Sequence, residues 1–464
     1  MIFNSLAFIV FFAFVLALYY RLGHRSQNRF LLLASYFFYG WWDWRFVGLL
    51  LFTSAVDFYV SKRLRAADGE GIRRRWVAFS VVTNLGVLGF FKYFNFFTDS
   101  MVALLNTVGF GADPVILRIL LPVGISFYTF QSMGYVIDVY RRRLEPVKSL
   151  PDYLLYVSFF PQLVAGPIER AEHLLPQIQR RRTITAAQVS SGIWLILLGF
   201  VKKTVIADHM AAIVNQGFAG GDFAPHGINS LMFVYAFAFQ IYGDFSGYSD
   251  IARGICKIMG FDILVNFRAP YLTSNPSDFW RHWHISLSTW IRDYLYIPLG
   301  GNRGGPTRTV KNLLLTMALA GLWHGAGFAY LLWGVYHGVL LVLHRFTGSA
   351  RVFVGWGHWI RVIGFFHLTC FGWLIFRCGS LSTDQAAALG SFIANVADVR
   401  SLSPLWWPVL LLGVACLGLQ WKSDEMDRFH EWSTVKQTAA VTSALVAITT
   451  LGVFEGSQFI YFQF

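Results

Sequence analysis

Long apolar runs constrain this chain more than any other feature. The first of them, FNSLAFIVFFAFVLALYY at residues 3–20, contains no charged residue, and similar runs recur along the 464 residues. Fifty-five percent of the residues are hydrophobic and only 14% are charged, with 45 Phe, 20 Tyr and 17 Trp. A soluble domain has too little interior to bury so much apolar surface, so the sequence predicts an integral membrane protein.

The apolar runs are continuous and do not alternate with polar residues, so the predicted spans are helices and not barrel strands. The first run has no basic region before it and no small-residue cleavage site after it, which favours a retained span over a removed signal peptide. We expect spans near residues 3–20, 30–60 (a hairpin), 76–94, 117–139, 227–247, 312–345, 355–376, 404–420 and 437–454. The predicted fold class is an all-α polytopic membrane protein of about 10–12 spans.

The formal net charge of +13 comes from basic residues that cluster in short connections. The clusters are Arg21, Arg25 and Arg29; Lys62, Arg63, Arg65 and Arg73–Arg75; Arg141–Arg143; and Arg180–Arg182. Short cytoplasmic loops carry such an excess of Lys and Arg, so we place all four clusters in the cytoplasm and the N-terminus outside. Anionic membrane lipids account for this charge, and nucleic acid is not expected as a partner.

Three segments are too polar or too broken to be ordinary spans. Prolines and glycines interrupt residues 153–170, Lys202 and Lys203 lie in the middle of the apolar segment 191–214, and residues 281–301 are amphipathic and aromatic. Irregular or polar segments are tolerated at membrane depth only where they are buried in protein or line a wet cavity. We therefore expect interfacial or re-entrant helices around a central funnel.

Four of the twelve histidines lie in two aromatic stretches, RHWHISLSTW and AGLWHGAGFAYLLWGVYHG. An ionisable residue inside a membrane protein is a candidate functional residue, and His324 is the clearest case because glycines follow it. The alternative is a core histidine that bonds a neighbouring carbonyl. His282 and His284 are two apart, so they cannot both face one small site. His337 and His344 share a helix face, which we interpret as a polar stripe or an inner rim.

The carboxylates and cysteines offer few further candidates for a functional site. Asp244 and Asp250 are possible general bases, but pairing with Arg253 or Arg281 is the favoured interpretation because buried carboxylates need partners. The four cysteines show neither a CxxC pair nor metal-ligand spacing, so we expect buried thiols, no structural disulfide and no metal site. The chain has no serine-nucleophile elbow, zinc-protease motif or P-loop. Any nucleophilic mechanism must therefore rest on histidine.

The stretch NPSDFWRHWHISLSTWIRDYLYIPLGGNR, followed by LAGLWHGAGFAYLLWGVYHG, resembles the signature region of the membrane-bound O-acyltransferases. The motifs LPVGISFYTFQSMGYVIDVYR, FFPQLVAGPIER and YGDFSGYSDIARG extend the resemblance over most of the first 345 residues. The chain is most similar to the alginate O-acetyltransferase branch, to which the teichoic acid D-alanine transferases are related. The resemblance implies one integral membrane acyltransferase domain over residues 1–464, with a signature core at about 120–345 and C-terminal helices at 350–464.

The resemblance also assigns roles to residues. His324, in the Trp-His-Gly motif, is the expected catalytic residue, and His284 is the expected second functional histidine. A neutral imidazole with a pKa near 6.5 suits proton transfer from an attacking hydroxyl, and an apolar wall favours the neutral form. His284 would orient the acceptor or stabilise the oxyanion. Further candidates for a substrate or donor tunnel are Trp323, Trp283, Arg281, Asp244, Arg303 and Arg308, although the arginines are equally well explained as anchors.

The function that the resemblance implies is acetyl transfer from a cytoplasmic donor, acetyl-CoA, for O-acetylation of a secreted polysaccharide such as alginate. Such a protein would lie in the bacterial inner membrane and would pass the acetyl group to a periplasmic or membrane-anchored polysaccharide O-acetyltransferase. Alternatives are peptidoglycan O-acetylation and D-alanyl transfer to teichoic acid from an acyl carrier protein. A non-enzymatic polysaccharide or lipid transporter is disfavoured, because transporters often contain internal repeats and none is visible here.

Overall fold

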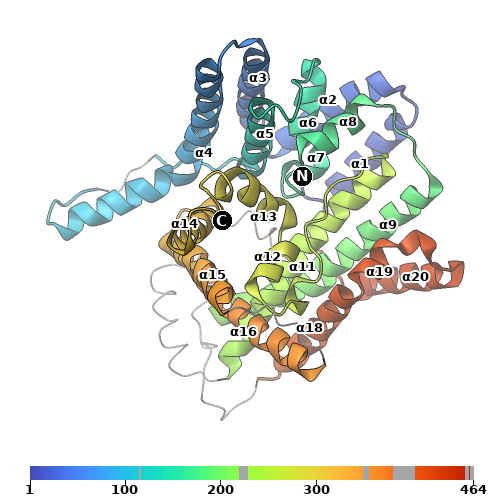
Figure 1. Cartoon of the computed structure of the whole chain (residues 1–464). Helices are drawn as coiled ribbons and strands as arrows, with labels where there is room; N and C mark the ends of the chain where they lie inside the picture. Colours follow the sequence, from blue (N-terminus) through green and yellow to red (C-terminus); the bar gives the residue numbers. More distant parts are fainter. Residues whose placement is uncertain (114–116, 219–227, 348–354, 380–402, 455–458, 460–464) are drawn as a thin grey trace. The chain divides into compact units, whose positions relative to one another are not determined.

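The computed structural model describes residues 1–113, 117–218, 228–347, 355–379, 403–454 and 459 (Figure 1). Over these residues the chain is helical and contains no strand, which confirms the all-α prediction. The helices pack as two compact units. The first comprises Met1–Thr183, Phe261–Ile263 and Gly325–Gly327, and the second comprises Ile184–Gly260, Leu264–His324 and Phe328–Phe464. That the whole chain acts as one acyltransferase domain stays a prediction.

The first unit is built from eight helices over the described part of residues 1–183: α1 (Leu6–Tyr19), α2 (His24–Asp43), α3 (Arg45–Ala66), α4 (Glu70–Thr107), α5 (Ile125–Tyr140), α6 (Leu150–Ser158), α7 (Phe160–Leu163) and α8 (Ala171–Gln179). The predicted hairpin at residues 30–60 corresponds to α2 and α3. Its turn lies at Trp44, whose side chain is 78% exposed. The segment after α6 is broken, as its prolines and glycines predict. The helix that follows, α7, is only 4 residues long.

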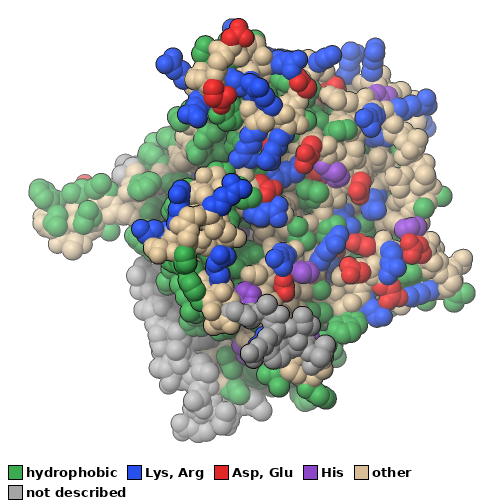
Figure 2. Space-filling view, viewed as in Figure 1, with side chains coloured by type: hydrophobic (Ala, Val, Ile, Leu, Met, Phe, Trp, Pro, Cys, Tyr) green, Lys and Arg blue, Asp and Glu red, His purple; other side chains and the backbone are tan. Residues whose placement is uncertain are grey.

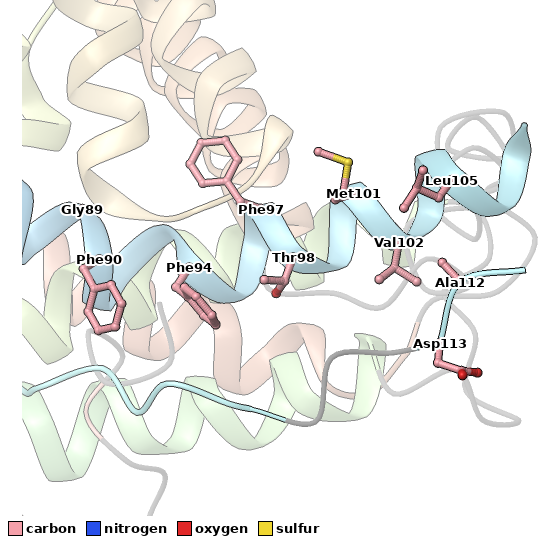
Figure 3. A pocket seen from close by; sticks show the side chains of 10 residues that line it. All are labelled: Gly89, Phe90, Phe94, Phe97, Thr98, Met101, Val102, Leu105, Ala112 and Asp113. Carbon is pink, nitrogen blue, oxygen red and sulfur yellow. The ribbon is translucent and has the colours of Figure 1, made fainter. Parts of the chain in front are cut away.

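Helix α4 is much longer than the predicted span at 76–94. It has 38 residues, and Glu70–Thr107 is long and apolar enough to cross a membrane. Its C-terminal half leaves apolar side chains exposed, including Phe97 and Met101. Figure 3 shows these side chains along α4 and the returning segment at Ala112 and Asp113, which together line a pocket of about 620 Å³. A surface of this composition suits contact with lipid.

The predicted span at 117–139 begins too early. Helix α5 starts at Ile125, directly after Pro122 and Gly124. Gly124 has a φ of +76°, and a Cβ atom there would lie 2.4 Å from the carbonyl oxygen of Leu163. Only glycine meets both conditions, so the backbone before Ile125 turns sharply and does not continue a helix.

The basic clusters of the first unit meet in pairs. The Arg73 guanidinium donates to the carbonyl oxygens of Leu64 in α3 and, at 2.7 Å, of Tyr140 in α5, which joins the second and third clusters. Arg182 donates to Tyr19 Oη at 2.8 Å and to Gln27 Oε1 at 3.1 Å, which joins the first and fourth. Figure 2 shows Lys and Arg side chains gathered where α3 is connected to α4. That all four clusters lie on one side, in the cytoplasm, stays a prediction.

The second unit contains the remaining elements: α9 (Ala186–Phe200), the π-helix η1 (Val201–Ala207), α10 (Asp208–Phe218), α11 (Asn229–Ile258), the 3₁₀ turn η2 (Pro270–Leu272), α12 (Pro276–His282), α13 (Ile285–Ile291), the π-helix η3 (Arg292–Tyr296), α14 (Pro306–His324), α15 (Phe328–Phe346), α16 (Trp356–Cys378), α18 (Trp406–Trp421), α19 (Ser423–Asp427), the 3₁₀ turn η4 (Phe429–Glu431) and α20 (Thr434–Leu451). Ala186–Phe218 and Trp356–Cys378 are also long and apolar enough to span a membrane.

Two of the predicted segments differ from the observed helices. The expected run at 312–345 is divided into α14 and α15, because the Gly-Ala-Gly sequence at 325–327 interrupts the helix. The segment at 191–214 is helical throughout, but it widens to a π-helix at Lys202 and Lys203. The amphipathic segment at 281–301 is divided between α12 and α13, a break that the sequence did not predict.

Candidate active site

Helices α14 and α15 place His324 by packing against each other in direct backbone contact. A Cβ atom on Gly321 would lie 2.1 Å from the carbonyl oxygen of Tyr330, and one on Gly334 would lie 2.1 Å from that of Met317. Any larger residue at these two positions would force the helices apart. The contact holds the last turn of α14, which ends at His324, against the first turns of α15.

The His324 side chain is enclosed by aromatic rings and is 7% exposed. Its ring centroid lies 4.9 Å from that of Trp323, 5.1 Å from that of Trp333 and 5.5 Å from that of Phe376. All three rings stand nearly perpendicular to the imidazole, at interplanar angles of 78° to 86°. Apolar neighbours disfavour a charged imidazole and exclude bulk water, two conditions that a general base acting on an ester bond requires.

His284 occupies the break between α12 and α13 in a left-handed backbone conformation, with a φ of 42° and a ψ of 57°. Such a conformation is strained for a residue other than glycine, and it persists only where the surroundings enforce it. Asn266 supplies the constraint, because its carbonyl oxygen accepts from Ile285 N at 2.9 Å and its Oδ1 accepts from Ser286 Oγ at 2.7 Å. Its Nδ2 donates in turn to Ser249 Oγ on α11 at 3.2 Å.

The two histidines meet at one indole ring. His284 is 1% exposed, its ring centroid lies 6.2 Å from that of Trp323, and Trp323 also contacts His324. Phe245 of α11 packs edge-on against the imidazole of His284 at 4.7 Å. The structure therefore brings together His324, His284 and Trp323, which are 40 residues apart at most along the chain.

The remaining predicted site residues fall into two groups. Trp283 is buried in the neighbouring aromatic cluster, with ring centroids 4.7 Å from Trp373 and 5.6 Å from Phe279. The three arginines are exposed, and Arg281, at 74% side-chain exposure, pairs with Asp278 at 3.0 Å. Arg303 and Arg308 lie in and after the glycine-rich connection before α14. The arginines are therefore outside the aromatic cluster that holds the histidines.

Asp244 belongs to a buried ion-pair network. Its Oδ1 lies 2.8 Å from Lys203 Nζ, so the predicted pairing of Asp244 with Arg253 or Arg281 is wrong. Asp250 does pair with Arg253, at 3.3 Å, but its shorter contact is 2.6 Å to Lys202. Lys202 and Lys203 thus pair with carboxylates of α11. These are the two lysines that distinguish residues 191–214 from an ordinary span. Because both carboxylates are held in ion pairs, we do not assign Asp244 a role as a base.

His337 is fully buried, with 0% exposure, so the predicted inner-rim position is wrong. The imidazole stacks on Phe279 at 6.0 Å and contacts Trp333 at 5.0 Å. Residue spacing gave no signal for this, because two of the aromatic rings that contact it, Phe279 and Trp280, come from another helix, α12. The sequence also gave no sign that Phe459 lies near the site. Its ring is 6.2 Å from that of Phe245, the residue that packs against His284.

No disulfide joins the four cysteines, all of which lie in the described part of the chain, and Cys256, Cys370 and Cys416 are buried. Within the described ranges, no cluster of three or more His, Cys, Asp or Glu side chains has the arrangement of a metal site.

Comparison with known proteins identifies the family. Residues 142–381 match the membrane-bound O-acyltransferase family. A probable alginate O-acetylase of Pseudomonas aeruginosa is 43% identical over 389 residues, covering 82% of this chain and 73% of that protein. One of Pseudomonas putida is 38% identical over 500 residues and covers 100% of both. A peptidoglycan O-acetyltransferase of Helicobacter pylori is 30% identical over 494 residues, covering 94% of this chain and 91% of that protein.

The chain belongs to the membrane-bound O-acyltransferase family, and it is an O-acyltransferase of the membrane. The family match spans both histidines, Trp323 and the α14–α15 hairpin.

Proposed function

We propose that this protein transfers an acetyl group from acetyl-CoA for the O-acetylation of a secreted polysaccharide such as alginate. The observation that carries the proposal is the meeting of His284 and His324 at the Trp323 ring, within the family-matched residues. The names of the two Pseudomonas relatives support acetyl as the acyl group and alginate as the polymer. Peptidoglycan is the second candidate acceptor, because the H. pylori relative covers 94% of this chain.

In the proposed reaction, the acceptor hydroxyl attacks the carbonyl carbon of the acetyl thioester while His324 takes up the hydroxyl proton. A carbon–oxygen bond forms and the carbon–sulfur bond breaks. The imidazolium then returns the proton to the leaving thiolate, which yields the ester and a free thiol. The aromatic rings around His324 keep out water, which would otherwise compete with the acceptor for the acetyl group.

His284 takes the supporting role in this proposal. Its strained backbone is held by Asn266 and α13, so the imidazole is fixed before substrate binds. A donor that is fixed in advance stabilises a developing oxyanion without reorganisation in the transition state. His284 would therefore act on the carbonyl oxygen while His324 acts on the hydroxyl.

We further propose that the donor binds from the cytoplasm and that the protein lies in the bacterial inner membrane. The support is the pairing of the basic clusters in the first unit, because clustered Lys and Arg favour the cytoplasmic side. Arg303 and Arg308, exposed beside the connection before α14, would contact the phosphates of the donor. A periplasmic or membrane-anchored polysaccharide O-acetyltransferase would supply the hydroxyl that accepts the acetyl group and would then pass that group on to the polymer.

Membranes that contain the protein can be supplied with labelled acetyl-CoA or, separately, with a carrier protein charged with D-alanine. We expect label in the polymer fraction with acetyl-CoA only, and none with His324→Ala at a matched membrane level. Digestion by an alginate lyase or by a lysozyme then identifies the labelled polymer. Labelling from the charged carrier alone would replace this proposal with D-alanyl transfer. Export of polymer without label, unchanged in His324→Ala, would support a transporter.

The orientation can be tested separately by cysteine labelling. In a variant without the four native cysteines, Glu70→Cys should react with a membrane-impermeant maleimide only after the inner face is exposed, because Glu70 begins α4 beside the basic clusters. Residue 4, before α1, should react from outside. Reaction at residue 70 in intact cells would reverse the orientation and remove the argument for a cytoplasmic donor.

A further inference from the structure

His337 carries two ring nitrogens into an aromatic interior. Neither Nδ1 nor Nε2 has a hydrogen-bond partner among the described residues, although the side chain is fully buried. The imidazole lies parallel to the Phe279 ring, with an interplanar angle of 6°. Helix α16 approaches closely on another side, because a Cβ atom on Gly372 would lie 2.7 Å from His337 Nε2.

Two tryptophans that contact His337 share this property. The ring centroids of Trp280 and Trp333 lie 5.2 Å and 5.0 Å from that of His337, and 5.7 Å from each other. The indole Nε1 atoms of both are buried and have no partner within the described ranges. Three mutually contacting rings, from α12 and α15, therefore carry four buried hydrogen-bonding nitrogens.

Packing alone does not account for this arrangement. A buried polar group left without a hydrogen bond costs about 1–3 kcal/mol, and a phenylalanine at residue 337 would fill the same ring space at no such cost. Buried polar groups in folded proteins are almost always satisfied by protein, water or ligand. The nitrogens of His337, Trp280 and Trp333 are therefore expected to form hydrogen bonds with a bound molecule or chemical group.

The chemistry of the three rings defines that bound group. Indole N–H groups can only donate, whereas a neutral imidazole donates at one nitrogen and accepts at the other. The complementary group must both accept and donate, as a hydroxyl, an amide or a water does. An anion or a cation fits poorly, because none of the three rings supplies a formal countercharge.

We propose that His337, Trp280 and Trp333 form a second polar site, which binds a small neutral group that both donates and accepts hydrogen bonds. The Trp333 ring contacts both His337 and His324, so the site lies one ring away from the candidate base. The inference rests on the proposed function in one respect, that His324 is where the reaction occurs. A hydroxyl or amide of a substrate bound here would be positioned beside the acyl group, whereas a resident water would fix Trp333 against His324.

His337→Phe tests the site, because it keeps the ring and removes both nitrogens. We expect kcat/KM to fall about tenfold or more, the scale of a lost hydrogen bond to a reacting complex, with an unchanged amount of folded protein in the membrane. His337→Gln should restore part of the loss, since an amide donates and accepts. His344→Phe is the matched control: it lies two turns further along α15, is partly exposed and should leave kcat/KM unchanged.

The kinetic parameters and the melting temperature distinguish the two sources of the bound group. If His337→Phe raises both KM and the melting temperature, the bound group belongs to the substrate. Without substrate the nitrogens of His337 are then unsatisfied, so their removal stabilises the protein. A fall in kcat with a lower melting temperature indicates a resident water. The inference is overturned if His337→Phe has wild-type kcat/KM. Activity is measured with whichever donor supports the wild type, so an inactive wild type with acetyl-CoA counts against the proposed function and not against this site.

Discussion

Two buried polar centres of the second unit handle the same physical problem in opposite ways. At η1, Lys202 and Lys203 carry charge into the protein, and ion pairs 2.6–2.8 Å long to Asp208, Asp244 and Asp250 neutralise it. Before α13 and at the end of α14, His284 and His324 place imidazole rings in the interior, and aromatic side chains surround them. The lysines therefore have carboxylate partners, whereas aromatic rings are the main neighbours of the two imidazoles.

The comparison separates stability from reactivity. A charge that is fully paired inside a protein is destabilising when its partner is removed, but it is poorly placed to exchange protons during a reaction. A neutral imidazole in an apolar cage contributes less to stability, yet it can take up a proton from an attacking hydroxyl and return it within one catalytic cycle. Variants at the lysine network should therefore lose stability, and variants at the histidines should lose activity. The expected free-energy effects are largest at Lys203 and smallest at Arg281.

The largest effect is expected for Lys203→Met. Removal of this charge leaves Asp208 and Asp244 buried without their lysine, which costs about 3–5 kcal/mol in comparable buried pairs. The expected result is a strong loss of folded protein and of melting temperature in detergent, measured by fluorescence-detected size exclusion after heating. Lys311→Met, at an exposed position of α14, serves as the control and should melt with the wild type. A stable, active Lys203→Met protein would show that the network is not structural.

His324→Ala should have the opposite profile. Acyl transfer is expected to fall about a hundredfold or more, the usual scale for loss of a general base, while insertion and melting change little. His324→Gln should be equally inactive, because an amide cannot accept the proton. The measurement is polymer acetylation at matched membrane levels. Near-normal acetylation in either variant would mean that His324 is not the base.

His284 tests how far a strained backbone matters. Asn adopts the left-handed conformation far more readily than a β-branched residue, and its amide can still donate to an oxyanion. We expect His284→Asn to retain about a tenth of the activity, and His284→Val to lose more and to melt lower, since backbone strain of this kind costs about 1–3 kcal/mol. Equal losses in the two variants, with equal melting temperatures, would rule out a backbone contribution.

The smallest effect on stability is expected at Arg281. Its ion pair with Asp278 is exposed, and such pairs contribute about 0–1 kcal/mol. Arg281→Ala should therefore melt within about 2 °C of the wild type. A drop as large as that of Lys203→Met would show that the position is buried by a partner in the membrane.

Hydropathy and motif spacing predicted the helical class, the hairpin at residues 30–60 and the interruption of residues 153–170. They could not predict that residues 312–345 divide at 325–327, since helix breaks depend on packing as well as on glycine. The ion partners of Asp244 and the burial of His337 were missed for a related reason. Both depend on which helix faces meet, and helix periodicity orders residues only within one helix. The prediction that His324 and His284 act together came from the family motif and not from spacing.

The contact between the end of α20 and η1 links the two extremes of the second unit's sequence. A π-helix leaves its carbonyls irregularly bonded, and the carbonyl oxygen of Thr204 accepts a hydrogen bond from Val453 N at 3.1 Å. Thr204 is the residue after Lys203. The segment that follows α20 therefore bonds the backbone directly beside a buried charge. A version of this protein shortened before Val453 would lose that donor, and its defect would emerge as misassembly of the lysine network and not as the removal of a passive tail.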